Sequence, residues 1–238
     1  MDYAMYIAGG VVFVPALLMM YYILRKYTYP AVEDPFFKDS TLFTLFAVGL
    51  IEGFVISAFY TQMDMSNILI GVLFAVIQVL LILVVLNLKR FHRKSDSVFY
   101  GFSLGMGQGV GMAFGISATL LSVFEEFGDV DMYTWAIIAV ITAMELMLMG
   151  SVGATVGEGV ARLALGEFTL QGMMVCTLSM IFWTFAVMGV DDWYWIPMSL
   201  LALSVSAYYF YKKIHLGLSS IVSEVLRIEV NKRKDIPR

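Results

Sequence analysis

The polar residues that fall inside apolar stretches are the candidates for chemistry in this chain. Glu52 lies within GLIEGFVIS and Glu145 within TAMELML, and Gln78, Asn87 and Gln108 add neutral hydrogen-bonding groups in similar surroundings. Polar side chains are costly in lipid and usually face the interior of a helical bundle. An acid there must be protonated, hydrogen-bonded or reached by water. We therefore expect Glu52 and Glu145 either to carry protons or to serve as neutral acids that hydrogen-bond a neighbouring helix.

The composition around these residues is that of a membrane protein. Hydrophobic residues make up 60% of the 238 and charged residues only 14%. Several apolar runs are long enough to cross a hydrocarbon layer, which takes about 20 helical residues. The sequence therefore predicts an all-α, polytopic membrane bundle. We expect seven transmembrane helices, at roughly 4–24, 41–61, 67–88, 97–123, 132–156, 169–189 and 193–211.

Charged residues divide between alternate loops of this arrangement. All 15 Lys and Arg residues follow the first, third, fifth or seventh expected span. The opposite side has acids and no cation, namely Asp2, Asp64, Glu125, Glu126, Asp129, Asp131, Asp191 and Asp192. Because positively charged loops are retained in the cytoplasm during insertion, we predict an outer N-terminus and a cytoplasmic C-terminus. The expected location is the plasma membrane of a prokaryote.

Two parts are expected along the chain: a transmembrane bundle over residues 1–211 and a basic cytoplasmic tail over residues 212–238. Apolar residues recur at helical spacing in the tail, at Leu218, Ile221, Val222, Val225 and Ile228. This pattern is typical of an amphipathic helix that lies on the inner leaflet or against a partner. A short helix with a frayed end is the alternative. At the end of the fifth span, Glu158 and Arg162 are four residues apart, which favours an ion pair.

Glycines mark the helices that are expected to pack most closely. They lie in two runs of the chain, at Gly101, Gly105, Gly107, Gly109, Gly111 and Gly115, and at Gly150, Gly153 and Gly157. In lipid, helix association depends on packing, and small residues let two backbones approach closely. We predict that the helices 97–123 and 132–156 are in close contact, with Glu145 directed into the bundle.

Metal and cofactor sites are not expected. Cys176 is the only cysteine, and the two histidines, His92 and His215, lie outside the middle of the spans. The 17 methionines are scattered, which is typical of gap-filling in apolar packing and not of a copper site. No lysine lies in mid-span, which excludes a retinal Schiff base. The expected partners are the lipid bilayer and another membrane protein or a second copy of the chain; no nucleic acid is expected.

Several motifs resemble those of a known superfamily. The segment Asp96–Gly101 (DSVFYG), followed by LGMG ending at Gly107, resembles the D-G-I-V-Y-G…G-L-G pattern of PrsW-type intramembrane metalloproteases. Residues 15–26 followed by 32–35 (VEDP) are similar to that family's first helix and E-P loop, and residues 144–157 resemble its H-x-x-x-T…G helix. The superfamily also includes CAAX-prenyl-type proteases and the scaffold subunit of gamma-secretase.

The chain departs from this family at the positions that carry its chemistry. Where the family has a Glu-Glu-x-x-Lys motif, the chain has only Gln78, and Met112 replaces the glutamate of the glycine-rich helix. The family's two membrane histidines correspond to Glu145 and Met180. A metal-activated water needs several nitrogen or carboxylate ligands and a proton-shuttling acid. The resemblance therefore implies a PrsW-like fold without peptidase activity.

Three functions are compatible with these observations, and we expect the first, with the second as its alternative. The resemblance and the small-residue faces favour a scaffold or binding subunit that holds another membrane helix. The intramembrane Glu52 and Glu145 favour a proton-coupled transporter or channel for a small solute. An active hydrolase with unorthodox ligands is the third, since Glu145 is still able to ligate a metal.

Overall fold

The structure, a computed structural model, is described for residues 2–127, 132–189 and 193–229. Within these ranges the chain is helical, without strands. Its helices, in chain order, are α1 (Asp2–Leu24), α2 (Asp39–Tyr60), α3 (Ile68–Leu86), the 3-10 turn η1 (Lys89–Phe91), α4 (Asp96–Phe127), α5 (Met132–Arg162), α6 (Leu165–Met188), α7 (Trp195–Phe210), the π-helical turn η2 (Tyr211–Leu216) and α8 (Leu218–Ile228).

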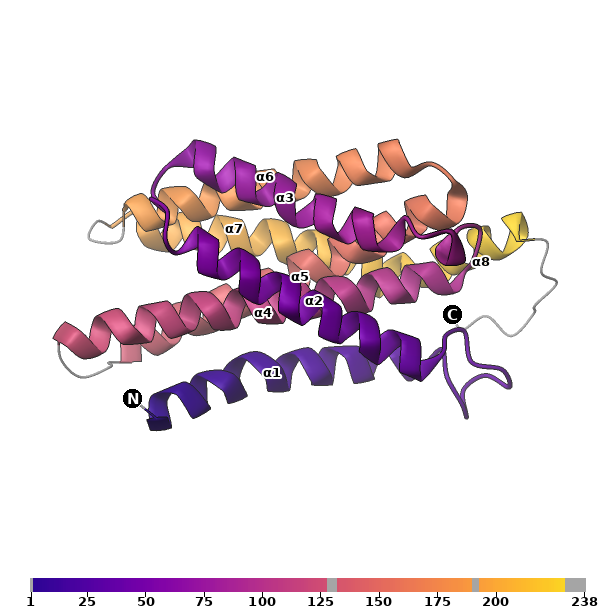
Figure 1. The fold of residues 1–238 in the computed structure, drawn as a ribbon, viewed down its shortest axis with the longest axis horizontal. Helices are drawn as coiled ribbons and strands as arrows, with labels where there is room; N and C mark the ends of the chain where they lie inside the picture. The colour runs from indigo at the N-terminus through magenta and orange to yellow at the C-terminus, as the bar shows by residue number, and fades with distance from the viewer. Residues whose placement is uncertain (1, 128–131, 190–192, 230–238) are drawn as a thin grey trace.

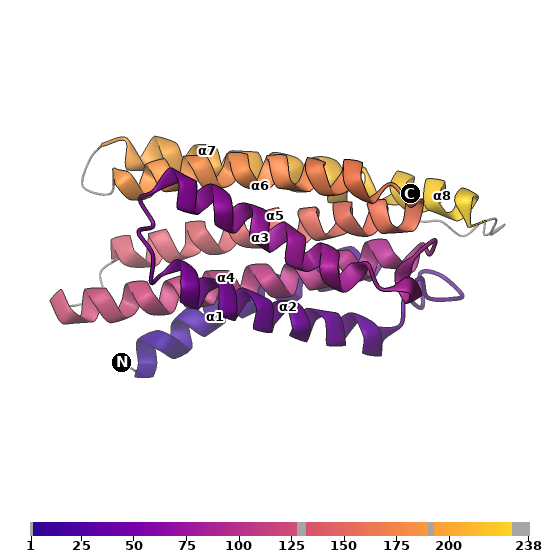
Figure 2. The same cartoon turned by 45° about the horizontal axis from the view of Figure 1, so that its top comes forward.

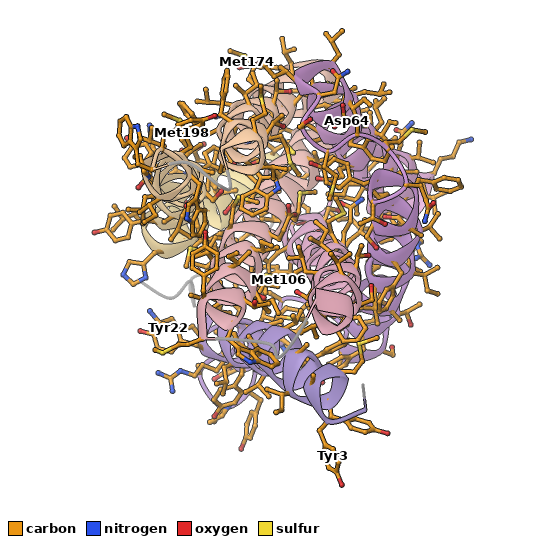
Figure 3. All side chains as sticks on the ribbon, turned by 90° about the vertical axis from the view of Figure 1, so that its left-hand side faces the viewer. Tyr3, Tyr22, Asp64, Met106, Met174 and Met198 are labelled. Carbon is orange, nitrogen blue, oxygen red and sulfur yellow. The ribbon has the colours of Figure 1, made fainter. Side chains whose placement is uncertain are left out.

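Six of these helices, α1 to α6, are long and apolar enough to cross a membrane. The view along the bundle in Figure 3 shows how the side chains divide: Met106 lies between the helices, whereas Tyr3, Tyr22 and Met174 project from the perimeter. Large apolar side chains that remain exposed on the outside of a bundle are suited to contact with lipid. The chain is a multi-pass helical membrane protein.

The fifth helix is longer than the sequence predicted. We expected it to end near residue 156, but α5 continues to Arg162. The added residues, 157–161, are all buried. Glycine is a poor helix former in isolation, but here tertiary packing outweighs the local cost.

The helices form layers around α4 and α5, which pack together along their lengths (Figure 2). Helix α2 crosses the other side of α4, and α1 lies outermost against α4. Helices α6 and α7 pair beyond α5, and α3 rests mainly on α6. The prediction of close contact between the fourth and fifth helices is confirmed.

Basic residues gather at the right-hand end of the bundle in Figure 1. Successive helices alternate in direction, so the segments 25–38, 87–95, 163–164 and 211–217 meet there. These segments, the end of α5 and helix α8 contain every Lys and Arg of the described residues. The connection at the other end that contains Asp64 has no cation. Asp129, Asp131, Asp191 and Asp192 lie outside the described residues, as do Lys232, Arg233 and Lys234.

The tail helix α8 is amphipathic, but its apolar face is covered by the bundle. Leu218, Val222 and Val225 are at most 4% exposed, whereas Ile228 is exposed. Arg162 at the end of α5 pairs with Glu224 of α8 at 2.6 Å. The face that the sequence suggested for a lipid leaflet or a partner is therefore buried within this chain.

Candidate functional site

Helix α4 carries two glycine stripes that face different neighbours. Gly101 and Gly105 face the backbone of α5, and Gly107 and Gly111 face the backbone of α2. A spacing of four residues keeps one helix face, whereas an offset of two residues turns the face by about 200°. The two stripes thus lie on opposite sides of α4, which is held between α2 and α5.

The contacts along both stripes are between backbones. A Cβ at Gly105 would overlap the carbonyl oxygen of Met149, and a Cβ at Gly107 would overlap that of Phe46. The partners contribute glycines of their own, at Gly49 and Gly53 of α2 and at Gly153 and Gly157 of α5. The small-residue faces that we expected to receive another membrane helix are therefore occupied within this chain.

Gly150 differs from Gly153 and Gly157 of α5. A Cβ built there would meet the side chain of Met106, with its sulfur at 2.7 Å, and not a backbone atom. Because a methionine side chain is flexible, this position tolerates a small residue better than the backbone contacts do.

Five polar side chains from five helices meet beside these interfaces. We call them the central polar cluster: Tyr60 of α2, Gln78 of α3, Gln108 of α4, Glu145 of α5 and Cys176 of α6. All five are 0% exposed. The Nε2 of Gln108 donates a hydrogen bond to the main-chain oxygen of Gln78 at 3.2 Å. The thiol of Cys176 donates to Oε1 of Gln78 at 3.6 Å.

Glu145 interacts electrostatically with both Tyr60 and Cys176. It comes from the stretch of α5 that packs on α4: a Cβ at Gly109 would lie 2.7 Å from the main-chain oxygen of Glu145. Glu145 is 0% exposed, so its side chain is directed into the bundle, as predicted.

Several polar atoms of the cluster have no hydrogen-bond partner among the described atoms of the protein. They are both carboxyl oxygens of Glu145, Oε1 of Gln108, Nε2 of Gln78 and the hydroxyl oxygen of Tyr60. An unsatisfied buried polar atom costs about 1–3 kcal/mol. The set includes donors and acceptors, which are the groups that water or a small polar solute can pair with.

The charge state of Glu145 follows from its surroundings. Every Lys and Arg that the structure describes lies at one end of the bundle, away from the cluster. A carboxylate without a counter-ion is heavily penalised in a dry, apolar interior. The neutral acid, which both donates and accepts a hydrogen bond, is the form that fits this site.

Glu52 lies apart from the cluster. Its helix, α2, and the helix of Glu145 pack on opposite faces of α4. Glu52 is partly exposed, and one of its carboxyl oxygens is buried without a partner in the described residues. Tyr60, farther along α2, interacts with Glu145, whereas Glu52 does not, so the structure does not bring the two intramembrane glutamates together.

Asn87 also lies outside the cluster. It is the C-cap of α3, is exposed, and its Oδ1 is 3.1 Å from Nε2 of His92. Its position at the end of the apolar run makes it a helix-terminating residue and not an intramembrane group.

Tyr60 and Cys176 are the members of the cluster that sequence reasoning did not single out. A signal for Tyr60 exists: with Gly49, Gly53 and Ser57 it continues one buried face of α2 at spacings of three and four residues. Cys176 similarly lies on the buried face of α6 with Gly172 and Ser179. Both residues could have been assigned to the site from the helix face on which they lie, but not from their chemical type.

The acids at the basic end of the bundle form a separate group. Glu158 is 2.6 Å from Arg162, which confirms the predicted pair, and 3.2 Å from Lys213 of the π-helical turn. Glu158 is therefore balanced by two cations, in contrast to Glu145.

No group of three or more His, Cys, Asp or Glu side chains in the described part of the chain is arranged to hold a metal ion. Glu145 is the single carboxyl group of the central polar cluster, whose other members are amides, a phenol and a thiol. The residues present offer hydrogen bonds and one titratable proton.

Comparison of the chain with protein-family models, with curated proteins and with solved structures gives no match. The likeness to PrsW-type proteases accordingly depends on the sequence motifs alone.

Proposed function

We propose that this chain is a non-proteolytic, PrsW-like membrane protein that carries a small polar solute together with a proton, with the central polar cluster as the binding site. The observation that carries this proposal is Glu145, an acid at 0% exposure whose two carboxyl oxygens have no partner among the described atoms, beside unpaired groups of Gln78, Gln108 and Tyr60. These groups supply complementary donors and acceptors to a small guest.

Protonation of Glu145 provides the coupling. The neutral acid is compatible with a closed bundle, whereas the carboxylate requires water or a counter-ion. Loss of the proton therefore favours a conformation in which the cluster is open to water. The proton that Glu145 takes up on one side of the membrane is released on the other side, together with the solute.

The arrangement of helices supports a relative movement through the cluster. Tyr60, Gln108 and Glu145 belong to α2, α4 and α5, whose backbones are in contact at glycines. Gln78 and Cys176 belong to α3 and α6, and α3 contacts α6 more extensively than it contacts α2, α4 or α5. Movement of α3 and α6 relative to the glycine-packed helices would open the cluster.

The proposal includes seven spans, an outer N-terminus and a prokaryotic plasma membrane. Helix α7 has 16 residues and continues directly into the six residues of the π-helical turn. With Lys212 and Lys213 of that turn at the membrane surface, the helical segment is long enough to reach across a hydrocarbon layer of about 30 Å. The basic residues at one end of the bundle support a cytoplasmic location for that end.

The test is proton flux in proteoliposomes. The purified full chain is reconstituted with pyranine trapped inside, and the internal pH is followed after addition of single members of a panel of small polar solutes. We expect solute-dependent proton entry in the wild type, loss of that entry in Glu145→Gln, and retention in Glu52→Gln, which makes the same chemical change outside the cluster.

Solute-dependent flux that is unchanged in Glu145→Gln would refute the assignment. Flux absent from the wild type with every solute, together with co-purification of a defined membrane partner, would favour the scaffold function instead.

A further inference from the structure

Three basic side chains surround a pocket at the end of the bundle where α2 and α4 begin. The pocket has a volume of about 210 Å³, and its lining includes Lys38, Arg90 and Lys94. A second pocket of about 120 Å³ adjoins it, since Thr41 and Arg90 line both. The residues come from three separate segments: the start of α2, the turn η1 and the approach to α4.

The floor of this pocket is built from buried, hydrogen-bonded residues. The hydroxyl of Tyr100, which is 3% exposed, accepts a hydrogen bond from the main-chain N–H of Lys38 at 3.0 Å. Phe91, 2% exposed, packs edge-on against Tyr100 with ring centroids 5.7 Å apart. The guanidinium of Arg90 lies over the Phe91 ring, 4.4 Å from its centroid. Two of the segments are thus joined beneath the pocket, and Arg90 is held beside it.

Three cations and a single carboxylate line the pocket in the part of the chain that the structure describes. Lys38, Arg90 and Lys94 form no ion pair there within 4.0 Å. That carboxylate is Asp96, which interacts electrostatically with Lys94 and with Glu229 after α8, so the positive charge of the pocket is offset in part. Helix α2 starts beside the pocket, and its N-cap residue, Lys38, makes no side-chain capping bond. The free N–H groups of this first helical turn add positive potential, which Asp39 in the same turn offsets in part.

We propose that this basic pocket binds a phosphate group. Arginine and lysine make strong charge-assisted hydrogen bonds to phosphate oxygens, and the hydroxyl of Thr41 offers a further donor. The pocket lies where the apolar helices end, which is the depth of phospholipid headgroups in a membrane. The group comes either from an anionic phospholipid or from a soluble phosphate compound. The inference does not depend on the transport function proposed above.

The experiment uses the purified full chain in a neutral detergent. Thermal unfolding is recorded against increasing dioctanoyl phosphatidylglycerol in one arm and inorganic phosphate in the other, and the shift in Tm gives the affinity. The pocket variant is Arg90→Gln/Lys94→Gln. The matched control is Lys89→Gln/Arg93→Gln, which removes the same charge from two exposed residues of the same segment that do not line the pocket. Lys94→Gln alone serves if the double variant does not fold.

We expect the pocket variant to bind about tenfold more weakly or worse, because two charge-assisted contacts are lost, and the control to stay within about twofold of the wild type. Saturable binding of the lipid only would assign the site to a headgroup, and saturable binding of inorganic phosphate would assign it to a soluble phosphate compound. Equal weakening in pocket and control variants, or no saturable binding of either probe to the wild type, would overturn the proposal.

Discussion

Replacement of Gly105 by alanine tests the close packing that places the central polar cluster. A Cβ at this position would overlap the carbonyl oxygen of Met149, and would lie 2.8 Å from its carbonyl carbon and 3.2 Å from Cα of Gly153. These are backbone atoms, so no side-chain rotation relieves the overlap. Helices α4 and α5 would have to separate by on the order of 1 Å to restore ordinary contact distances.

The magnitude follows from two opposing effects. Overpacking costs about 1–3 kcal/mol of unfolding free energy. Replacement of a helical glycine by alanine returns about 0.5–1 kcal/mol, because the unfolded chain loses freedom. Gly10 of α1 has no neighbouring atom within 4 Å of a built Cβ, so Gly10→Ala isolates the second effect. Gly150→Ala, which meets the side chains of Met106 and Phe102 and no backbone atom, is expected to fall between the two.

The assay is unfolding of the full chain in mixed micelles by increasing dodecyl sulfate, followed by circular dichroism. We expect the stability order Gly10→Ala, then wild type and Gly150→Ala, then Gly105→Ala. If Gly105→Ala were as stable as Gly10→Ala, the backbone contact between α4 and α5 would not exist as described, and the placement of Glu145 would lose its basis.

Three further predictions concern individual side chains. In a Glu52→Gln background, which removes the other intramembrane acid, infrared spectra at neutral pH should contain a protonated carboxylic-acid band that disappears on Glu145→Gln. The band should persist on Glu158→Gln, since Glu158 is paired with Arg162 and Lys213. An unchanged band after Glu145→Gln would mean that Glu145 is ionised. Burial raises the pKa of Tyr27, between α1 and α2, from 10.0 to about 12. Because the folded state holds the phenolic proton more tightly than the unfolded state, the free energy of unfolding falls as the pH rises from about 10 to about 12. Chemical unfolding of wild type and Tyr27→Phe at each pH should show a smaller loss of stability in Tyr27→Phe. An equal dependence of stability on pH in the two proteins would contradict this prediction. Cys176, at 0% exposure, should resist maleimide in the folded protein and react after denaturation; rapid labelling of the folded chain would show that water already reaches the cluster.

Much of the architecture could be predicted from the sequence because it depends on local properties. In a membrane, an apolar run of sufficient length forms a helix regardless of which helices pack against it. Helices α1 to α6 therefore lie close to the expected ranges. The ion pair of Glu158 and Arg162 is likewise local, since residues four apart share a helix face. The helix pair that brings Gly105 close to Gly153 could be inferred because small residues on two neighbouring spans have few other uses in lipid.

The candidate site was only partly predictable because its members come from five helices. Gln78, Gln108 and Glu145 were identifiable as polar residues in apolar surroundings, but their convergence depends on the rotation of each helix about its axis. The same rotation places Tyr60 and Cys176 in the cluster.

By itself, the sequence determined a helical membrane protein with its cations at one end, a glycine-rich helix, and buried acids in apolar surroundings. Composition and spacing suffice for these features because each is a property of one segment and its contact with lipid or water. The tertiary structure alone decided that α4 is held between α2 and α5, so that Glu52 and Glu145 lie on opposite sides of it and Asn87 lies outside the cluster. It also decided that Lys213 joins Glu158. The physical reason is that a helical period defines which face is buried, whereas the neighbour that covers that face is selected by packing against the whole chain.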